Sequence, residues 1–444
     1  MRDITIKNFR CYTEKTIEFY SGINLLIGDN SVGKTSLLHA CNLVVGSFFS
    51  GYSDENTVWN SADDKDFRNT GIAEKPIEIT FHAGTWDFLP VTTNENTLSV
   101  LNWRNEYKIE KSSKKNARNL VTGLKSLRDY ASQLQQHSHY LSENEEIMQR
   151  NILPVYACFT TEDIHSVRKF NKEKFKRYTQ KPSFGYYECN DCRGLLDCWI
   201  KRLLVLKEAD RGFDEISTVK SAIIEALGEK GCNIIADMKI RHNEGKVYFT
   251  FTDGREAESS LLSDGYRRLV NIVMDIAFRC ALLNKALFAD ECYKFTHGTV
   301  IIDEIDEHLH PALQVRVLKA LQNTFPKIQF IVSTHAPLVM SSVEPRTDEN
   351  GNPINVVYKL EYAEGVYTHR ELNTYGMDAS TIIESSMGQP ARAIEVDRSI
   401  KDILNLIDEE KIQEARSALE TIQKNVTASD PELTRMEALI SFME

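Results

Sequence analysis

A glycine-rich loop near the start of the chain has the residue types and spacing that bind phosphate. It matches the pattern Gly-x-x-x-x-Gly-Lys-Thr, follows the apolar run Ile23–Ile27 and precedes a helix expected over Lys34–Val45. The loop and the start of that helix comprise Gly28, Asp29, Asn30, Ser31, Val32, Gly33, Lys34, Thr35 and Ser36. We expect backbone N–H groups and the Lys34 charge to hold the phosphates of a nucleotide, and the Thr35 hydroxyl to ligate Mg²⁺.

Two adjacent carboxylates, Asp303 and Glu304, follow an apolar strand expected at Thr299–Ile302. A carboxylate at the tip of a buried strand is suited to holding nucleotide-bound Mg²⁺, so we assign the metal to Thr35 and Asp303. Glu304 would then be the general base that polarises the attacking water. An acidic pair after a strand can also be a solvated turn, but the phosphate-binding loop favours the catalytic interpretation.

Two further elements concern the terminal phosphate of the nucleotide. Ser263, Asp264 and Gly265 open a long expected helix, so a hydroxyl, free N–H groups and the helix dipole would face a γ-phosphate. Ser263 could also serve simply as the N-cap of that helix. His335 follows a strand expected at Ile328–Ser333 and could hydrogen-bond the same phosphate.

This ordered set of motifs resembles the ABC-type ATPases of the SMC and RecF-like group. The resemblance implies an α/β fold of the ABC-type P-loop class, with a mostly parallel sheet, an antiparallel β subdomain and a mainly helical insertion. It implies that Lys34, Glu304 and His335 serve ATP hydrolysis, and that segment 263–265 acts in trans in a homodimer or higher homo-oligomer. Arg10 matches a basic residue that approaches the nucleotide in this group.

The chain departs from that family at three places. The usual signature has two glycines where this chain has Asp264 and Gly265, and the D-loop region, Asp306–His310, lacks the usual Leu-Asp ending. No convincing Q-loop glutamine is present. These departures leave the turnover rate open.

A closer resemblance lies in the motifs Leu153–Cys158, Leu262–Arg267, Ile302–Pro311 and Phe325–Phe330. They are similar to the stand-alone bacterial ATPases that include PtuA of the Septu anti-phage system and those of related retron systems. In that family the ATPase works with a separate HNH nuclease, which implies a regulatory ATPase in anti-phage defence. The alternative is a RecF-like repair or recombination ATPase that binds DNA itself. A transporter ATPase is disfavoured, because a long insertion separates the two lobes.

Strands that alternate with helices predict a mostly parallel sheet. We divide the chain into an N-terminal ATPase lobe (1–101), a mainly helical insertion (102–262), a C-terminal ATPase lobe (263–377) and a C-terminal helical region (378–444). Within this plan, apolar spacing predicts one helix of roughly 25 residues over 124–148. It also predicts a single helix at Pro311–Asn323 and three helices after Ser380, separated near Gly388 and Asp430.

Four further segments could carry a function outside the ATPase motifs. No nuclease centre is expected, because Glu364-Gly365 lacks the Asp-x-Asp that a Toprim domain needs. Cys189 and Cys192 lack a second pair for a structural zinc, so free thiols are the better interpretation. The run 168–181 interleaves cations with aromatics and could contact nucleic acid, although such runs are usually solvated faces. The region after Ser380 could dock a partner.

Composition limits the class of protein. The 444 residues carry a formal net charge of −11, so any nucleic-acid contact requires a local basic patch. No apolar run reaches the roughly 18 residues of a membrane span, and the first residues do not resemble a signal peptide. The 9 cysteines are scattered and odd in number, which suggests a reducing cytoplasm rather than a disulfide framework.

Overall fold

The chain was examined as a computed structural model. The structure describes residues 1–68, 75–87, 100–102, 105–112, 123–136, 138, 140–141, 146–147, 151–161, 172–177, 180–192, 194–424 and 430–443. They form two compact units, Met1–Gly376 and Met377–Glu444. The candidate site lies entirely in the first unit.

A six-stranded sheet forms the centre of the first unit, with strand order β10-β14-β15-β3-β16-β17. The strands are β3 (Ile23–Ile27), β10 (Val155–Phe159), β14 (Gly298–Ile302), β15 (Ile328–Ser333), β16 (Val356–Ala363) and β17 (Val366–Leu372). All neighbours pair in parallel except β16 and β17, which form an antiparallel hairpin. Every residue of β3 and β15 is buried, as expected for strands covered on both faces.

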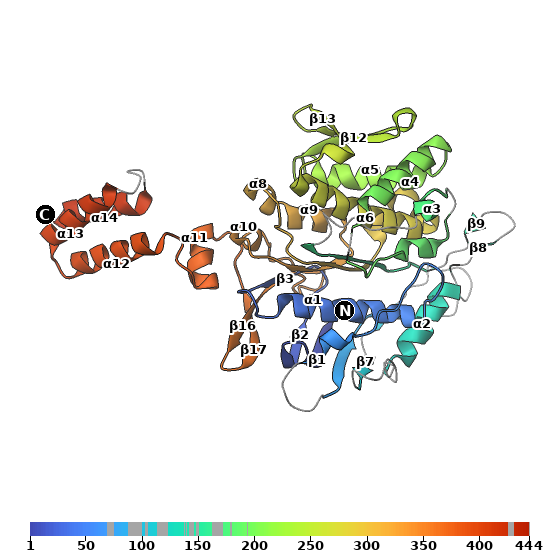
Figure 1. Cartoon of the computed structure of the whole chain (residues 1–444), viewed down its shortest axis with the longest axis horizontal. Coiled ribbons are helices and arrows are strands. Elements are labelled where there is room, and N and C mark those ends of the chain that lie inside the picture. The colour runs from blue at the N-terminus through green and yellow to red at the C-terminus, as the bar shows by residue number, and fades with distance from the viewer. Residues whose placement is uncertain are drawn as a thin grey trace. The chain divides into compact units, whose positions relative to one another are not determined.

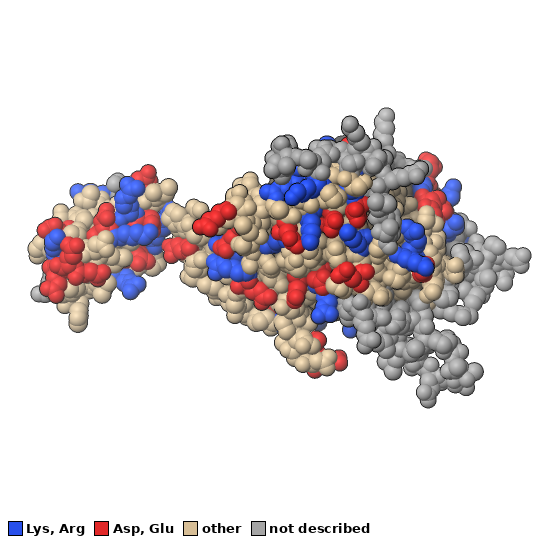
Figure 2. Space-filling view, turned by 90° about the horizontal axis from the view of Figure 1, so that it is seen from below, with Lys and Arg blue, Asp and Glu red and all other residues tan. Residues whose placement is uncertain are grey.

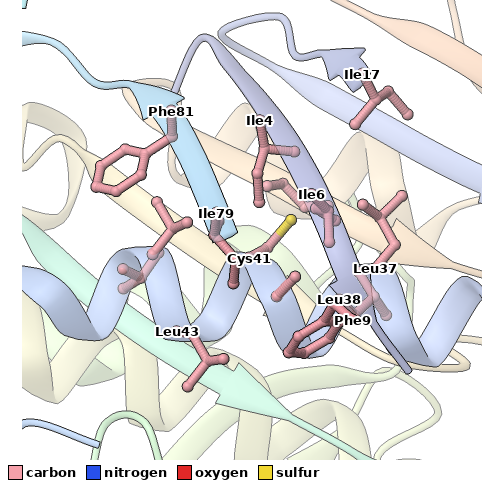
Figure 3. Packing of buried hydrophobic residues seen from close by; sticks show 14 of the residues in the cluster. Ile4, Ile6, Phe9, Ile17, Leu37, Leu38, Cys41, Leu43, Ile79 and Phe81 are labelled. Atoms are coloured by element: carbon pink, nitrogen blue, oxygen red, sulfur yellow. The ribbon is translucent and has the colours of Figure 1, made fainter. Parts of the chain in front are cut away.

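An antiparallel sheet of order β2-β1-β4-β7 covers one side of helix α1 (Figure 1). Its strands are β1 (Asp3–Phe9), β2 (Tyr12–Glu18), β4 (Ile77–His82) and β7 (Glu106–Lys111), and α1 spans Lys34–Gly46. Side chains of β1 and β4 alternate between buried and partly exposed, and their buried members pack on α1 (Figure 3). Because Leu37 and Cys41 of α1 belong to this core, the helix that begins in the phosphate-binding loop is fixed in place.

Four helices cover the face of the six-stranded sheet that points away from α1 (Figure 1). They are α4 (Leu196–Glu208), α5 (Phe213–Leu227), α6 (Asp264–Phe288) and α9 (Val317–Thr324). Helix α6 is buried along most of its length. Within it, the buried Asp275 accepts from Trp199 Nε1 at 2.6 Å and from Arg279 Nε at 2.6 Å. A small antiparallel sheet of β11 (Ile235–Arg241), β12 (Lys246–Phe251) and β13 (Glu256–Glu258) precedes α6.

The remaining α-helices and strands of the first unit, apart from α2, have four residues or fewer. They are β5 (Thr85–Asp87), β6 (Val100–Asn102), α2 (Lys125–Gln136), β8 (Tyr140–Leu141), β9 (Glu146–Ile147), α3 (Lys172–Phe175), α7 (Cys292–Phe295), α8 (Pro311–Gln314) and α10 (Pro337–Met340).

The second unit is helical and has a core of its own. After α11 (Ala379–Thr381) and a π-helical turn over Ile382–Met387, it consists of α12 (Ile394–Asp408), α13 (Ile412–Gln423) and α14 (Pro431–Met443). Ile403, Leu419 and Met436 pack together in its core. Acidic residues outnumber basic ones in this unit, and on the face drawn in Figure 2 they gather at one of its ends.

Three predictions about helices were wrong in detail. The helix expected over 124–148 ends at Gln136, because residues 140–141 pair with 146–147 as short antiparallel strands instead. The helix expected at Pro311–Asn323 is two helices, α8 and α9, with a break at Val315 and Arg316. The C-terminal helices are also interrupted at 409–411, a break that the apolar spacing did not predict.

Candidate nucleotide-binding site

The candidate site lies where three neighbouring parallel strands end. The glycine-rich loop follows β3, Ser333 ends β15 with Thr334 and His335 after it, and Asp303 and Glu304 follow β14. Since the carboxyl ends of parallel strands meet at one edge of a sheet, pairing of these strands brings distant segments of the chain together.

The loop itself curls in a way that its glycines permit. Gly28 and Gly33 have φ of 144° and 95°, and a Cβ on either would lie 2.4 Å from Leu360 O or Tyr12 Oη. Lys34 Nζ donates to Gly28 O at 2.7 Å and to Asp29 O at 2.9 Å. Burial lowers the pKa of Lys34, while nearby carboxylates, Asp303 first among them, oppose that effect. The Lys34 ammonium is thus held against the curled loop, where a phosphate group would need its charge.

Thr35 and Asp303 meet directly, although 268 residues separate them in sequence. Thr35 Oγ1 donates to Asp303 Oδ2 at 3.0 Å. A hydroxyl beside a carboxylate fits Mg²⁺, which commonly takes one or two protein ligands and completes its shell with phosphate oxygens and water. In the described part of the chain, no three His, Cys, Asp or Glu side chains form a metal-binding group, so an ion here would depend on the nucleotide.

The turn that carries Glu304 is strained and held on one side by Ser333. Glu304 has a φ of 51°, in the left-handed region that disfavours side chains other than glycine. Its N–H donates to Ser333 Oγ at 2.8 Å, and the Ser333 hydroxyl donates to Asp303 Oδ1. Burial raises the pKa of the Glu304 carboxyl and the Asp303 charge adds to this, while His335 acts in the opposite direction. A raised pKa makes this carboxylate a stronger base.

Asp306 joins the D-loop region to the segment that carries His335. Its carboxylate accepts a hydrogen bond from Thr334 Oγ1 and another from the His335 N–H at 3.3 Å. The position of His335 is therefore determined by a residue three positions after Asp303. Sequence spacing did not reveal this link, because the strand pairing that creates it is not local.

The segment Ser263–Gly265 lies at the N-terminus of α6 with its first two residues exposed. Ser263 occupies the N-cap position, but its side chain makes no capping hydrogen bond, so capping does not account for it. A Cβ on Gly265 would lie 2.4 Å from His308 O, so this glycine permits close packing against the D-loop. No bond joins Ser263 or Asp264 to the glycine-rich loop within the described chain, and their exposure is compatible with action on a second subunit.

Arg10 lies beside the site but is engaged by another residue. Its Nε donates to Asp66 Oδ1 at 2.8 Å, and His39 Nε2 lies 3.2 Å from the same oxygen. Burial acts to raise the pKa of Asp66, but hydrogen bonds from His39, the Asp63 N–H and Arg10 outweigh it and hold that pKa at about 2. The expectation that Arg10 approaches the nucleotide stays a prediction.

A cavity of about 920 Å³ continues from the Thr35–Asp303 pair. His39, Trp59, Asp66 and Thr160 are among its lining residues, and sequence reasoning selected none of them. Thr160 had a usable signal, since it follows β10, the strand that pairs with β14. The others come from α1 and from the loop after it, where no motif marks them.

The family of the chain follows from its first 340 residues. A family model described as an AAA ATPase domain (AAA_15) matches residues 1–340. The chain belongs to this AAA ATPase domain family. Membership implies that the protein binds ATP. The expected α/β fold is present, with a mostly parallel central sheet and a separate antiparallel sheet.

Individual relatives of this ATPase carry related names. The Retron Vc95 probable ATPase of Vibrio cholerae serotype O1 biovar El Tor is 37% identical over 158 residues, 35% of this chain and 29% of the relative. The Septu protein PtuA of Bacillus thuringiensis is 24% identical over 421 residues, 90% of this chain and 88% of the relative. The SMC head domain from Thermotoga maritima is 14% identical with a TM-score of 0.39, over 84% of this chain and 98% of that structure. The chain thus spans less than a third of the length of the retron relative.

One prediction about the cysteines of this ATPase was wrong. Cys158 and Cys192 form a disulfide rather than remaining free, with their Cα atoms 4.4 Å apart. The reason is tertiary: β10 carries Cys158 to the turn that contains Cys192, which adjoins the cavity. Cys189 of the same turn is a buried free thiol.

The basic run 168–181 is described only in part, since residues 168–171, 178 and 179 lie outside the described chain. Among the others, Lys174 donates to Glu55 O and Lys181 to Glu55 Oε1, at 3.1 and 2.9 Å. Phe175 is fully buried against Trp199, so this aromatic residue is core rather than a stacking platform for bases. Nucleic-acid contact by the run stays a prediction. In the described chain, no helix is long and apolar enough to cross a membrane.

Proposed function

We propose that this ATPase hydrolyses ATP at the site between the glycine-rich loop and the Asp303–Glu304 turn. The observation that carries the proposal is the 3.0 Å hydrogen bond from Thr35 Oγ1 to Asp303 Oδ2. It joins the end of the phosphate-binding loop to the first of two adjacent carboxylates, 268 residues further along the chain. A hydroxyl, a carboxylate, an ammonium and a second carboxylate in one place are the groups that nucleotide hydrolysis requires.

Each residue has a task in this proposal. The loop N–H groups and Lys34 bind and orient the phosphates, while Glu304 accepts a proton from the attacking water. His335 donates a hydrogen bond to the terminal phosphate. Thr35 and Asp303 would hold Mg²⁺, which when bound neutralises phosphate charge.

We further propose that the site is completed by a second copy of the chain. The exposed Ser263 and Asp264 and the dipole of α6 would face the terminal phosphate bound by another subunit. ATP would then favour a homodimer or a larger homo-oligomer, and hydrolysis would release it.

The biological role we propose is regulation within a bacterial anti-phage defence complex. Support comes from the similarity to proteins named Septu PtuA and retron probable ATPase. By the resemblance to that group, the nucleotide state of this chain would control a separate HNH-type nuclease through assembly. Co-expression with such a nuclease, followed by DNA cleavage across an ATP series, tests this role. ATP-dependent DNA binding by the purified chain alone would support the RecF-like alternative instead.

The hydrolytic assignment is tested by Glu304→Gln. The variant keeps the shape of the side chain but removes its basicity, so we expect ATP turnover to fall by about 10²-fold or more while ATP binding persists. Size-exclusion chromatography with light scattering should find a nucleotide-bound assembly that does not dissociate. Glu364→Gln is a matched control, because Glu364 also has a φ of 51° in a turn after a strand but lies in the β16–β17 hairpin. Wild-type turnover in Glu304→Gln would exclude Glu304 as the base.

A further inference from the structure

A buried arginine on the signature helix contacts the backbone of the catalytic turn. Arg268 lies on α6 five positions after Ser263, and its side chain is 0% exposed. Its Nη2 donates to Asp303 O at 2.7 Å and to Glu304 O at 3.0 Å, and its Nη1 pairs with Glu307 Oε2. One guanidinium therefore binds the carbonyls of both proposed catalytic carboxylate residues and a carboxylate of the next turn.

Such a contact places a buried charge against the backbone of the site. Burying a guanidinium is unfavourable unless hydrogen bonds and a counter-charge compensate, and an apolar side chain could fill the same space without that requirement. Two other buried arginines of the chain, Arg202 and Arg279, have carboxylate partners, Glu215 and Asp275, away from the site. Arg279 also donates to two backbone oxygens, Gly185 O and Tyr187 O. Arg268 differs in that its two backbone acceptors belong to the strained turn that carries the proposed catalytic carboxylates.

The contact of Arg268 helps to hold the strained backbone of that turn. Glu304 has a φ of 51°, and a residue other than glycine keeps this conformation only when its surroundings impose it. Ser333 binds the N–H of Glu304, and Arg268 binds its carbonyl oxygen. The peptide groups on both sides of the Glu304 side chain are thus held by different elements, β15 and α6.

A second contact joins the same helix to the same region. Gly265 at the start of α6 packs so closely on the D-loop that an added Cβ would meet His308 O at 2.4 Å. The helix therefore touches the segment after β14 at two places, Gly265 and Arg268. Any movement of α6 relative to the sheet would be transmitted to the turn that carries Glu304.

We propose that Arg268 is a positioning residue that couples the signature helix of a subunit to the Glu304 turn of that same subunit. The proposal rests on the function proposed above, in which the Ser263 end of α6 contacts a nucleotide bound by another copy. Binding at one site would then set the position of Glu304 in the other, so the two sites would hydrolyse in concert. Arg268 itself does not contact nucleotide.

Three variants test this inference. Arg268→Ala removes all three contacts, whereas Arg268→Lys keeps a charge beside Glu307 but lacks the planar fork, which reaches Glu307 with Nη1 and both carbonyls with Nη2. Arg267→Ala is the matched control, because Arg267 is the adjacent cation on α6 and pairs with the exposed Asp197. We expect ATP turnover to fall by about 10–100-fold in Arg268→Ala, less in Arg268→Lys, and hardly at all in Arg267→Ala.

Other readouts separate positioning from binding and folding. Affinity for a fluorescent ATP analogue should stay within about threefold of wild type in all three variants, because the loop is untouched. Equal turnover in Arg268→Ala, Arg268→Lys and Arg267→Ala would overturn the inference, as would loss of ATP binding in a folded Arg268 variant. If Arg268→Ala does not fold, Arg268→Lys decides the question by the same criteria.

A measurement that needs no activity distinguishes this inference from the proposed function. Hydrogen exchange of the amides in 303–307 should be at least about tenfold faster in Arg268→Lys than in Arg267→Ala. If wild-type protein hydrolyses no ATP but this difference is found, the proposed function fails and the positioning role of Arg268 stands. Unchanged exchange in 303–307 would overturn the role of Arg268 whatever the activity.

Discussion

Replacing Ser333 with alanine would remove a single hydroxyl that connects both carboxylate residues of the site. Ser333 is fully buried at the end of β15. Its Oγ accepts from the Glu304 N–H at 2.8 Å and donates to Asp303 Oδ1. Ser333→Ala adds no atom and creates little new space, so its effect should come from these two hydrogen bonds.

The expected magnitude follows from what the two partners lose. An amide N–H left buried without an acceptor costs about 1–3 kcal/mol. Asp303 loses less, because Thr35 Oγ1 still donates to its other oxygen. We therefore expect Ser333→Ala to lower the free energy of unfolding by about 2 kcal/mol. Without the hydroxyl, the Glu304 N–H has no acceptor, although Arg268 and the backbone bond from Ile305 N–H to Ser333 O still hold the turn on either side of it. Turnover should then fall by about 10²-fold, as a displacement near 1 Å would produce.

Urea unfolding and steady-state ATP hydrolysis measure the two effects separately. Ser341→Ala is a suitable control, because the Ser341 hydroxyl donates only to the nearby Leu338 O. The reasoning is refuted if Ser333→Ala hydrolyses ATP as fast as Ser341→Ala. A variant that is destabilised but fully active would show that Ser333 serves folding and does not position Glu304.

Two further predictions concern the neighbourhood of the site. Gly265→Ala should abolish nucleotide-dependent assembly and turnover but leave ATP binding intact, because its Cβ would meet His308 O at 2.4 Å and displace the start of α6. Light scattering measures the assembly and a fluorescent ATP analogue measures the binding. Normal assembly would contradict the prediction. The pKa of Asp66 is about 2 in the folded chain, against an ordinary value of 3.8. Its ionised form therefore stabilises the fold by roughly 2 kcal/mol above pH 4. This contribution is lost as the pH falls through 2. Asp66→Asn should therefore lower stability at pH 7 and reduce its fall between pH 4 and 2, as urea titrations at several pH values would reveal; an unchanged acid profile would contradict the prediction.

The elements that hold the candidate site were largely predictable from local patterns. The apolar run Ile23–Ile27 and the strand before Asp303 were expected as buried strands, and both lie in the central sheet. Helix α1 was expected at the glycine-rich loop and begins there. These predictions succeed because strand and helix periodicity and turn-forming glycines act over a few residues.

Predictions failed where a distant segment decided the outcome. The helix over 124–148 was extrapolated from apolar spacing alone, but it ends at Gln136 where the chain pairs with itself as strands. Cys192 was expected as a free thiol but forms a disulfide with Cys158, because spacing in sequence says nothing about which side chains meet.

The amino-acid sequence by itself determined which chemical groups are present and in what order: a phosphate loop, a helix that opens with Ser263, two carboxylates and a histidine, each flanked by the element it needs. Only the tertiary structure decided which residues hold those groups in position. Ser333 and Arg268 lie outside the motifs, and the D-loop motif that contains Asp306 did not reveal its partner. Each of the three acts through a hydrogen bond to a segment at least 28 residues away. Such bonds depend on strand register and helix packing, which are properties of the whole unit rather than of any stretch within it.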